Sequence, residues 1–168
     1  AKVLYGHRLD GIIAIGGEGT LAIAEQFHNR GFPVIGVPKT IDNDLAATEL
    51  TFGFMTAIDV ATEALDRLHT TAASHDRVMI LEVMGRHTGW IALHAGLAGS
   101  ADIILIPEIP FSFESVIRKV QERENSGSRF TNIVVAEGAM EVGKGEMYSD
   151  TQELRLGGMR DHVRKVVE

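Results

Sequence analysis

The sequence predicts an α/β fold, a three-layer sandwich in which a mostly parallel sheet lies between layers of helices. Two observations lead to this prediction. Apolar runs of strand length alternate with segments of helical periodicity along the 168 residues. The strand-like runs are continuously apolar, which is typical of parallel strands covered on both faces. With 45% hydrophobic and 23% charged residues, the chain can build one domain with a real core.

In the first half of the chain, residues 10–17 form an apolar run closed by glycines and are expected to be a strand. Helical spacing follows over residues 20–31, with Gly31 as the expected C-cap. Residues 32–37 are expected to form the second strand. After a polar stretch, residues 52–73 carry apolar side chains at helical spacing and contain few helix breakers.

The second half continues the alternation. Further strands are expected at residues 77–83, 101–108 and 131–139. Further helices are expected within 85–99 after a loop, over 111–125 from near Ser112, and within 156–168. No repeat, linker or low-complexity segment interrupts the pattern.

Composition excludes several classes of function. The formal net charge of −7 argues against a nucleic-acid partner, because phosphate backbones require a clustered basic face. The absence of cysteine excludes disulfide scaffolds, cysteine-ligated zinc and thiol catalysis, and fits a cytoplasmic location. No apolar run reaches the length of a membrane span, so no membrane partner is expected. The 18 glycines are partly clustered, which favours sites lined by backbone.

Four of the expected strands end in polar or glycine-rich loops, at residues 16–20, 38–44, 84–86 and 136–139. In an open parallel sheet the ligand crevice lies outside the carboxyl ends of the strands. The four loops are therefore expected to converge in space.

The loop GGEGT, residues 16–20, follows a strand and opens a helix. Its bare backbone and the helix N-terminus could hold a phosphate group. It has neither the Walker A pattern nor the dinucleotide G-x-G-x-x-G spacing. The alternative is a tight turn in which the glycines pack and Glu18 is solvated.

The loop PKTIDND concentrates polar chemistry at the end of the second strand. In an extended segment Asp42 and Asp44 would project to the same side and face one pocket. One carboxylate could take a proton from a hydroxyl while the other helps to hold magnesium, and Lys39 and Thr40 could donate to phosphate oxygens. The alternative is an Asx-rich turn that caps a helix near Thr51.

Single residues after later strands suggest further roles. Arg86 could stabilise charge on a transferring phosphoryl group, or be a surface residue. Glu137 could bind sugar hydroxyls, or be a solvated residue at a strand end. His87 and His94 are expected on a helix surface or in packing rather than at a metal, and Trp90 is expected in the core.

Taken together, IGGEGT, PKTIDNDL, SHDRVMILEVMGRHTGW, IPE and VAEG resemble the 6-phosphofructokinase family, in this order and at these intervals. The resemblance covers almost the whole chain. PKTIDND with MGR is highly specific, whereas NAD kinases and diacylglycerol kinases carry a similar glycine turn.

The resemblance implies phosphorylation of the 1-hydroxyl of fructose 6-phosphate in glycolysis, with Mg²⁺ and ATP. Asp42 matches the catalytic base, Thr40 a residue at the transferring phosphate, and Arg86 the residue that stabilises the transition state. Positions matching donor contacts are Gly17, Glu18, Gly19, Thr20 and Lys39, and Glu18 and Asp44 match magnesium-linked carboxylates. Positions matching sugar-phosphate contacts are Thr40, Asp42, Asp44, Arg77, Met84, Gly85, Arg86 and Glu137.

Two further positions concern assembly and regulation. Arg77 matches an arginine that reaches the sugar phosphate in a neighbouring subunit, which implies a homodimer or a homotetramer. Glu108 matches a position at the effector site of regulated bacterial enzymes.

Two residues disagree about the phosphoryl donor. Gly19 resembles the ATP type, because the pyrophosphate type usually has Asp there, which would crowd and repel the α-phosphate of a nucleotide. Lys39 resembles the pyrophosphate type. We favour ATP, because the absence of a side chain is what admits a nucleotide. The alternatives are a pyrophosphate-dependent phosphofructokinase, or a non-catalytic subunit of the same fold.

The family's glycine-rich first turn and its later arginines and histidine have no counterpart in residues 1–168. The chain is therefore expected to be an internal fragment of a phosphofructokinase domain, lacking the N-terminal nucleotide-binding turn and the C-terminal part. Activity of this fragment by itself would then be incomplete.

Overall fold

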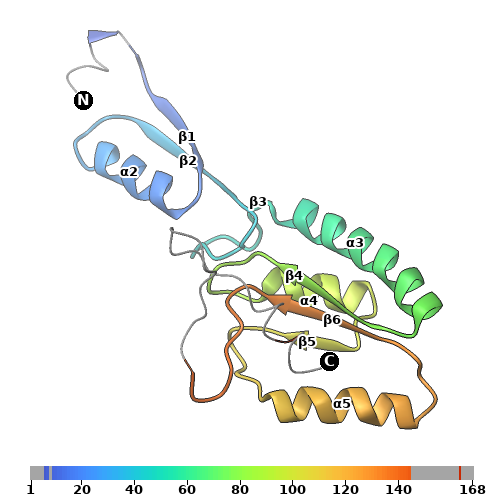
Figure 1. Ribbon diagram of the computed structural model, residues 1–168. Coiled ribbons are helices and arrows are strands. Elements are labelled where there is room, and N and C mark those ends of the chain that lie inside the picture. The colour runs from blue at the N-terminus through green and yellow to red at the C-terminus, as the bar shows by residue number, and fades with distance from the viewer. Residues whose placement is uncertain (1–5, 8, 145–162, 164–168) are drawn as a thin grey trace, which may run out of the picture. The chain divides into compact units, whose positions relative to one another are not determined.

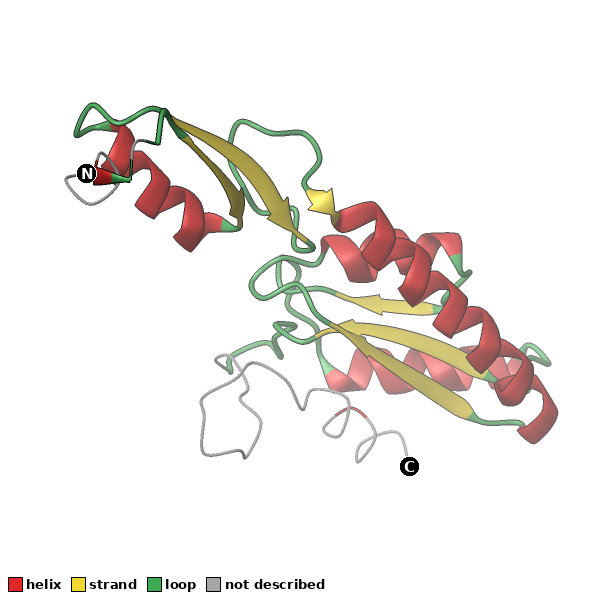
Figure 2. Cartoon of the chain, turned by 90° about the horizontal axis from the view of Figure 1, so that it is seen from above, coloured by secondary structure: helices red, strands yellow, loops and turns green. Residues whose placement is uncertain are grey.

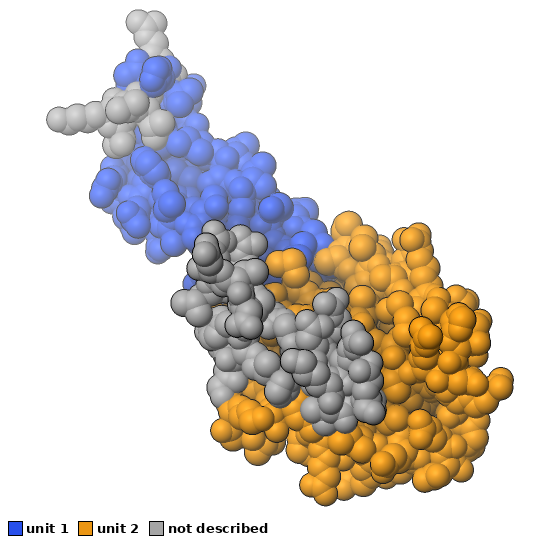
Figure 3. Space-filling view, in the orientation of Figure 1, with its two compact units in different colours: residues 1–54 blue, residues 55–168 orange. Residues whose placement is uncertain are grey.

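The computed structural model describes residues 6–7, 9–144 and 163 (Figure 1, Figure 2). The chain forms two compact units, residues 1–54 and residues 55–168 (Figure 3). Each unit is described separately below. The helix expected within 156–168 lies outside the described residues except for Val163, which is helical and buried.

The first unit is a small parallel sheet with one helix. Its elements are β1 (Ile12–Gly16), α2 (Glu18–His28), β2 (Val34–Thr40) and β3 (Phe52–Gly53). The strands lie in the order β1-β2-β3, and both pairings are parallel. Helix α2 packs on β1 and β2 (Figure 1).

Several boundaries in this unit differ from the sequence expectation, and three of them matter for the site. Helix α2 ends at His28 with Asn29 as its C-cap, and Gly31 instead supplies a positive φ of 80° two residues later. Strand β2 continues through Lys39 and Thr40 because these residues pair with β3. Strand β3 occupies the two positions at which the long helix was expected to begin, since a short pairing there overrides the helical spacing.

The second unit is a parallel sheet between helices. Its elements are α3 (Phe54–His75, beginning at the last residue of the first unit), β4 (Val78–Val83), α4 (Trp90–Ala98), β5 (Ile103–Leu105), α5 (Phe113–Asn125) and β6 (Thr131–Ala136). The strands lie in the order β4-β6-β5, all parallel. As expected, α5 begins after Ser112, whose hydroxyl accepts a hydrogen bond from the Ser115 backbone.

The core of the second unit surrounds β6, whose six residues are all buried. Ile133 and Val135 pack with Val116 of α5 on one face of the sheet. Val134 packs on the other face with Leu65 of α3 and Ala92 of α4. This unit therefore has the predicted three layers, which explains the continuously apolar strands. The α/β prediction is confirmed, although the described strands form two three-stranded sheets rather than one.

The prediction that Trp90 is a core residue is wrong. Its side chain is 42% exposed, because the buried face of α4 is made by Ile91, Ala92 and Ala95. The Trp90 ring lies 6.0 Å from the ring of His94, one turn along the exposed face. His94 is exposed on the helix surface, as expected.

No helix among the described residues is both long enough and apolar enough to cross a bilayer.

Candidate active site

The glycine turn of the first unit joins β1 directly to α2. Gly17 is the N-cap of α2 and supplies no side-chain cap. The first backbone N–H groups of a helix have no acceptor within the helix, so such an end can hold an anion. Thr20 packs against Gly16, where an added Cβ would lie 2.4 Å from the threonine hydroxyl oxygen. Around Gly19 the space is open as far as the described residues go, because an added Cβ would meet none of their heavy atoms within 4 Å.

This turn lies beside the end of β2. A Cβ on Gly17 would lie 3.8 Å from Cβ of Thr40 and 4.0 Å from the carbonyl oxygen of Lys39. The contact follows from the parallel register, which places Gly16 opposite Pro38 at the carboxyl ends of the two strands. Two of the four polar loops therefore meet within the first unit, as the sequence predicted.

Thr40 and Asp42 point toward each other. The Thr40 hydroxyl lies 3.4 Å from Oδ2 of Asp42, and it accepts a hydrogen bond of 3.2 Å from the Asp42 backbone N–H. The first distance marks a weak hydrogen bond. Asp42 is half-buried and lies two residues after the end of β2, beside Thr40.

The extended backbone assumed for Asp42 and Asp44 ends at Thr40, because Asn43 has a left-handed φ of 52°. The Asn43 Oδ1 accepts a hydrogen bond of 2.9 Å from the Thr51 backbone, and its Nδ2 donates to the Glu49 carbonyl over 3.3 Å. This arrangement resembles the Asx alternative, but it closes the loop rather than capping α3. Sequence reasoning missed the role of Asn43, although asparagine is favoured at such backbone angles.

Thr51 completes the closure of this loop. It is 4% exposed, and its hydroxyl donates to the Thr40 carbonyl over 2.8 Å. The two ends of segment 40–51 are therefore joined directly by the hydrogen bond from Thr51 to Thr40. Asn43, inside the segment, is also bound to Thr51. Asp44 lies on the exposed part of this loop.

The second unit brings together the loops that follow β4 and β6. The Arg86 backbone N–H donates to Oε1 of Glu137 over 2.8 Å. Arg86 has a left-handed φ of 53°, and Gly85 before it has a φ of 147° that suits glycine alone. A Cβ on Gly138 would lie 2.2 Å from the Arg86 carbonyl oxygen, so the two backbones are in direct contact. The expected proximity of Met84–Arg86 to Glu137 is therefore observed.

The loop after β5 also reaches the Arg86 loop. Oε1 of Glu108 accepts a hydrogen bond of 2.9 Å from the backbone N–H of Gly89, the N-cap of α4. A Cβ on Gly89 would lie 2.4 Å from Cβ of Ile106, which shows how closely the two loops pack. This contact was not predicted, because Gly89 and Glu108 are 19 positions apart and the periodicity of the helix and strand between them does not specify which loop atoms meet.

Arg77 is not brought together with these residues. It precedes β4, whereas Met84, Gly85 and Arg86 follow that strand. The six residues of β4 span about 20 Å. Arg77 therefore lies at the amino end of this strand, whereas the Arg86 loop follows its carboxyl end. Its side chain is exposed.

The donor set for a metal ion is sparse. Among the described residues, no group of three or more His, Cys, Asp or Glu side chains could hold a metal ion. Glu18 and Asp44 are both exposed. Exposed carboxylates of this kind match the way in which Mg²⁺ is commonly bound, by one or two carboxylates together with several waters and substrate phosphates.

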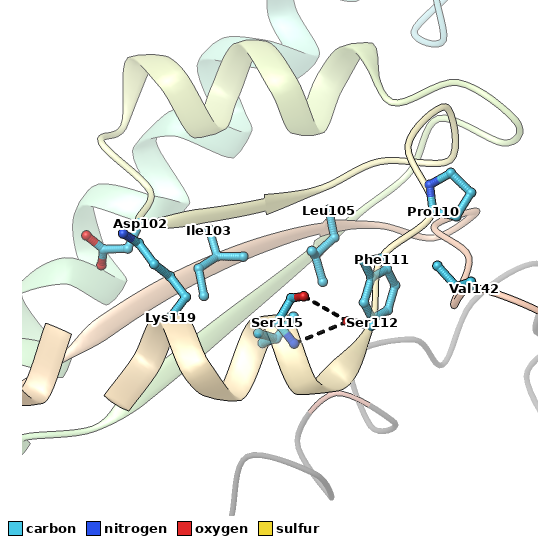
Figure 4. Close-up of a pocket in the computed structure, with 10 residues that line it drawn as sticks. Asp102, Ile103, Leu105, Pro110, Phe111, Ser112, Ser115, Lys119 and Val142 are labelled. Atoms are coloured by element: carbon cyan, nitrogen blue, oxygen red, sulfur yellow. Dashed lines mark hydrogen bonds between the residues drawn. The ribbon is translucent and has the colours of Figure 1, made fainter. Parts of the chain in front are cut away.

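A cavity of about 450 Å³ opens beside α5 in the second unit (Figure 4). Its walls combine apolar side chains such as Ile103 and Phe111 with Ser112, Ser115 and Lys119. The hydroxyls of the two serines lie 2.8 Å apart. None of the predicted site residues lines this cavity, so it is separate from both groups described above.

Comparison with known proteins shows the family to which the chain belongs. The family model described as phosphofructokinase matches residues 1–167. The chain belongs to the phosphofructokinase family. The sequence resemblance to this family is thereby confirmed over almost the whole chain.

Individual relatives in this family are named for different phosphoryl donors. The chain is 66% identical over 160 residues to an ATP-dependent 6-phosphofructokinase of Chloroflexus aurantiacus, covering 95% of this chain and 44% of the relative. It is 55% identical over 162 residues to a pyrophosphate–fructose 6-phosphate 1-phosphotransferase of Amycolatopsis methanolica, covering 94% of this chain and 47% of that relative. The chain thus spans less than half the length of either curated relative.

A solved phosphofructokinase structure from Saccharomyces cerevisiae matches with a TM-score of 0.81 and 28% identity, covering 98% of this chain and 24% of that one. This likeness supports the α/β phosphofructokinase-like fold.

Proposed function

We propose that the protein containing this chain transfers the γ-phosphoryl group of ATP to the 1-hydroxyl of fructose 6-phosphate. The products are ADP and fructose 1,6-bisphosphate. The proposal rests on family membership over residues 1–167 and on one structural observation. That observation is the meeting of the glycine turn with Thr40, whose hydroxyl lies 3.4 Å from Oδ2 of Asp42, at the carboxyl ends of β1 and β2.

The geometry of the first unit suits a base beside a phosphate site. Asp42 accepts the proton of the sugar hydroxyl, whose oxygen then attacks the γ-phosphorus as ADP leaves. Thr40 stands between Asp42 and the glycine turn, where its hydroxyl can donate to the transferring group. The N-terminus of α2 with Gly17, Gly19 and Thr20 favours the negative charge of the donor phosphates.

In the second unit, Arg86 supplies positive charge for the transferring group, since Arg stabilises charge in phosphoryl transfer. Glu137 and the backbone of Met84 and Gly85 recognise the sugar. These residues belong to loops that contact each other at the carboxyl ends of β4 and β6.

Mg²⁺ would be held by Glu18 and Asp44 together with donor phosphate oxygens. When bound, the ion neutralises charge on the phosphates that are transferred and released. The exposure of both carboxylates leaves room for water and phosphate ligands.

The structure makes Gly19 the most informative residue for the donor. An added Cβ at Gly19 would meet no heavy atom of the described residues within 4 Å. A side chain there could therefore affect a bound nucleotide without displacing other described residues. Lys39 lies at the end of β2, where it could contact either donor. Pyrophosphate is the second candidate donor, favoured by Lys39 and by the Amycolatopsis methanolica relative.

We further propose a cytoplasmic homo-oligomer, either a dimer or a tetramer. Arg77 is exposed and precedes β4, a strand about 20 Å long that separates it from the loop carrying Arg86, which suits a contact with the sugar phosphate of a neighbouring subunit.

The direct test expresses the complete coding sequence and measures fructose 1,6-bisphosphate formation with Mg²⁺ and either ATP or pyrophosphate. We expect product with ATP. Asp42→Ser should lower turnover by roughly 10²–10⁴-fold, the usual contribution of a positioned base. Product with pyrophosphate alone would overturn the donor assignment, and wild-type turnover in Asp42→Ser would overturn the role of Asp42.

A further inference from the structure

We propose that Glu108 is a positioning residue for the loop that carries Arg86, an inference that rests on the function proposed above. Two carboxylates from different strand ends hold this loop. Glu137 accepts a hydrogen bond from the Arg86 backbone, and Glu108 accepts one from the Gly89 backbone. The loop is thus held at Arg86 and again three residues later, at the start of α4.

The turn from Gly85 to Thr88, which contains Arg86 and directly precedes Gly89, is short and closed by hydrogen bonds. The backbone N–H and the hydroxyl of Thr88 both donate to the Gly85 carbonyl, each over 2.9 Å. A displacement of Gly89 is therefore transmitted to Gly85 and Arg86 rather than absorbed by a flexible loop. The left-handed backbone of Arg86 persists only while such surrounding contacts hold it.

Glu108 also provides the acidic partner that α4 lacks. The first turn of α4 contains no acidic residue, and its N-cap Gly89 has no side chain. In a capping box, an acidic side chain three residues after the N-cap accepts a hydrogen bond from the N-cap backbone. Here the same bond is made by Glu108 from the loop after β5. Its negative charge at the helix N-terminus is favoured by the helix dipole.

The two loops also pack closely against each other, in addition to the hydrogen bond from Gly89 to Glu108. Gly89 approaches Ile106 so closely that an added Cβ would also lie 2.8 Å from Oε2 of Glu108. Loss of the Glu108 carboxylate would remove the polar part of this contact and leave the apolar part. We therefore expect the loop to shift without unfolding of the unit.

The test compares Glu108→Ala, Glu108→Gln and Glu114→Ala in the protein expressed from its complete coding sequence. Glu114 is the matched control, because it is an exposed glutamate in the first turn of α5. We expect Glu108→Ala to lower kcat about tenfold with little change in KM, since a misplacement near 1 Å costs up to roughly 10²-fold in rate. Glu108→Gln retains an acceptor oxygen and should recover most of kcat, and Glu114→Ala should match wild type.

A double-mutant cycle separates positioning from a general structural role. If Glu108 acts through Arg86, Glu108→Ala should have almost no further effect on kcat in an Arg86→Ala background. An equal loss in both backgrounds would overturn the proposal. So would failure of Glu108→Gln to recover activity while the protein remains folded.

Hydrogen exchange at the Gly89 amide tests the contact independently of catalysis. We expect faster exchange at residues 85–89 in Glu108→Ala and unchanged exchange in Glu114→Ala. Unchanged exchange in Glu108→Ala would refute the anchoring contact even if the enzyme is active. If wild type made no fructose 1,6-bisphosphate, the proposed function would fail while this exchange measurement would still decide whether Glu108 holds the loop.

Discussion

Gly138→Ala should damage both stability and turnover, because the Gly138 backbone touches the backbone of Arg86. An added Cβ would lie 2.2 Å from the Arg86 carbonyl oxygen, whereas real Cβ contacts essentially never fall below 3.0 Å. The two loops must therefore separate by about 0.8 Å before the methyl group is accommodated. Both partners are backbone, so no side-chain rotation can relieve the overlap.

The expected cost has two parts. Overpacking a well-packed site typically costs about 1–3 kcal/mol of stability. Displacement of Arg86 also strains its 2.8 Å hydrogen bond to Glu137. Since misplacements near 1 Å cost up to roughly 10²-fold in rate, kcat should fall by about 10- to 100-fold.

The assay measures thermal unfolding and fructose 1,6-bisphosphate formation in wild type, Gly138→Ala and Gly6→Ala. Gly6 is the matched control, because an added Cβ there meets no heavy atom within 4 Å in the part of the chain that the structure describes. Gly6→Ala should behave as wild type. A Gly138→Ala protein with wild-type Tm and wild-type kcat would refute the inferred contact between these loops.

Three further predictions follow from other contacts. Gly19→Asp should weaken ATP use and leave the first unit as stable as before or slightly more stable, because the described surroundings are open and an acidic side chain suits the first turn of a helix. An unchanged kcat/KM for ATP would show that Gly19 does not select the donor. Asn43→Ala should destabilise the protein by about 1–2 kcal/mol, because it removes the acceptor of the Thr51 backbone N–H, and should lower kcat because Asp42 is displaced. Wild-type values in both unfolding and turnover measurements would refute the role of Asn43. Asn132→Val should raise Tm, because both polar atoms of this fully buried amide lack a hydrogen-bond partner among the described residues and relief of such a group yields about 1 kcal/mol. A lower Tm, measured by thermal unfolding, would refute this reasoning.

The sequence by itself determined the class of fold and the places where polar chemistry accumulates. Continuous apolar strands that alternate with segments of helical periodicity indicate a parallel sheet covered on both faces. The loops that follow such strands all lie at the carboxyl ends of the strands. That reasoning correctly joined the glycine turn to Thr40, and the Arg86 loop to Glu137. It works because strand direction and parallel pairing alone decide which loop ends become neighbours.

Only the tertiary structure decided which atoms meet within those loops. Glu137 and Arg86 are 51 residues apart, and Glu108 and Gly89 are 19 apart, so no local pattern encodes either hydrogen bond. The exposure of Trp90 likewise depends on which face of α4 meets the sheet, because an almost uniformly apolar helix carries little directional signal.

The loop after β2 shows the same division. The sequence PKTIDND determined that carboxylates, an amide and a hydroxyl would gather at this strand end. Pairing with β3 and the hydrogen bond from Thr51 to Asn43 decided that Lys39 and Thr40 remain in the strand and that Asn43 turns the backbone. The physical reason is that backbone pairing with a distant segment outweighs the weak local preferences of a few polar residues.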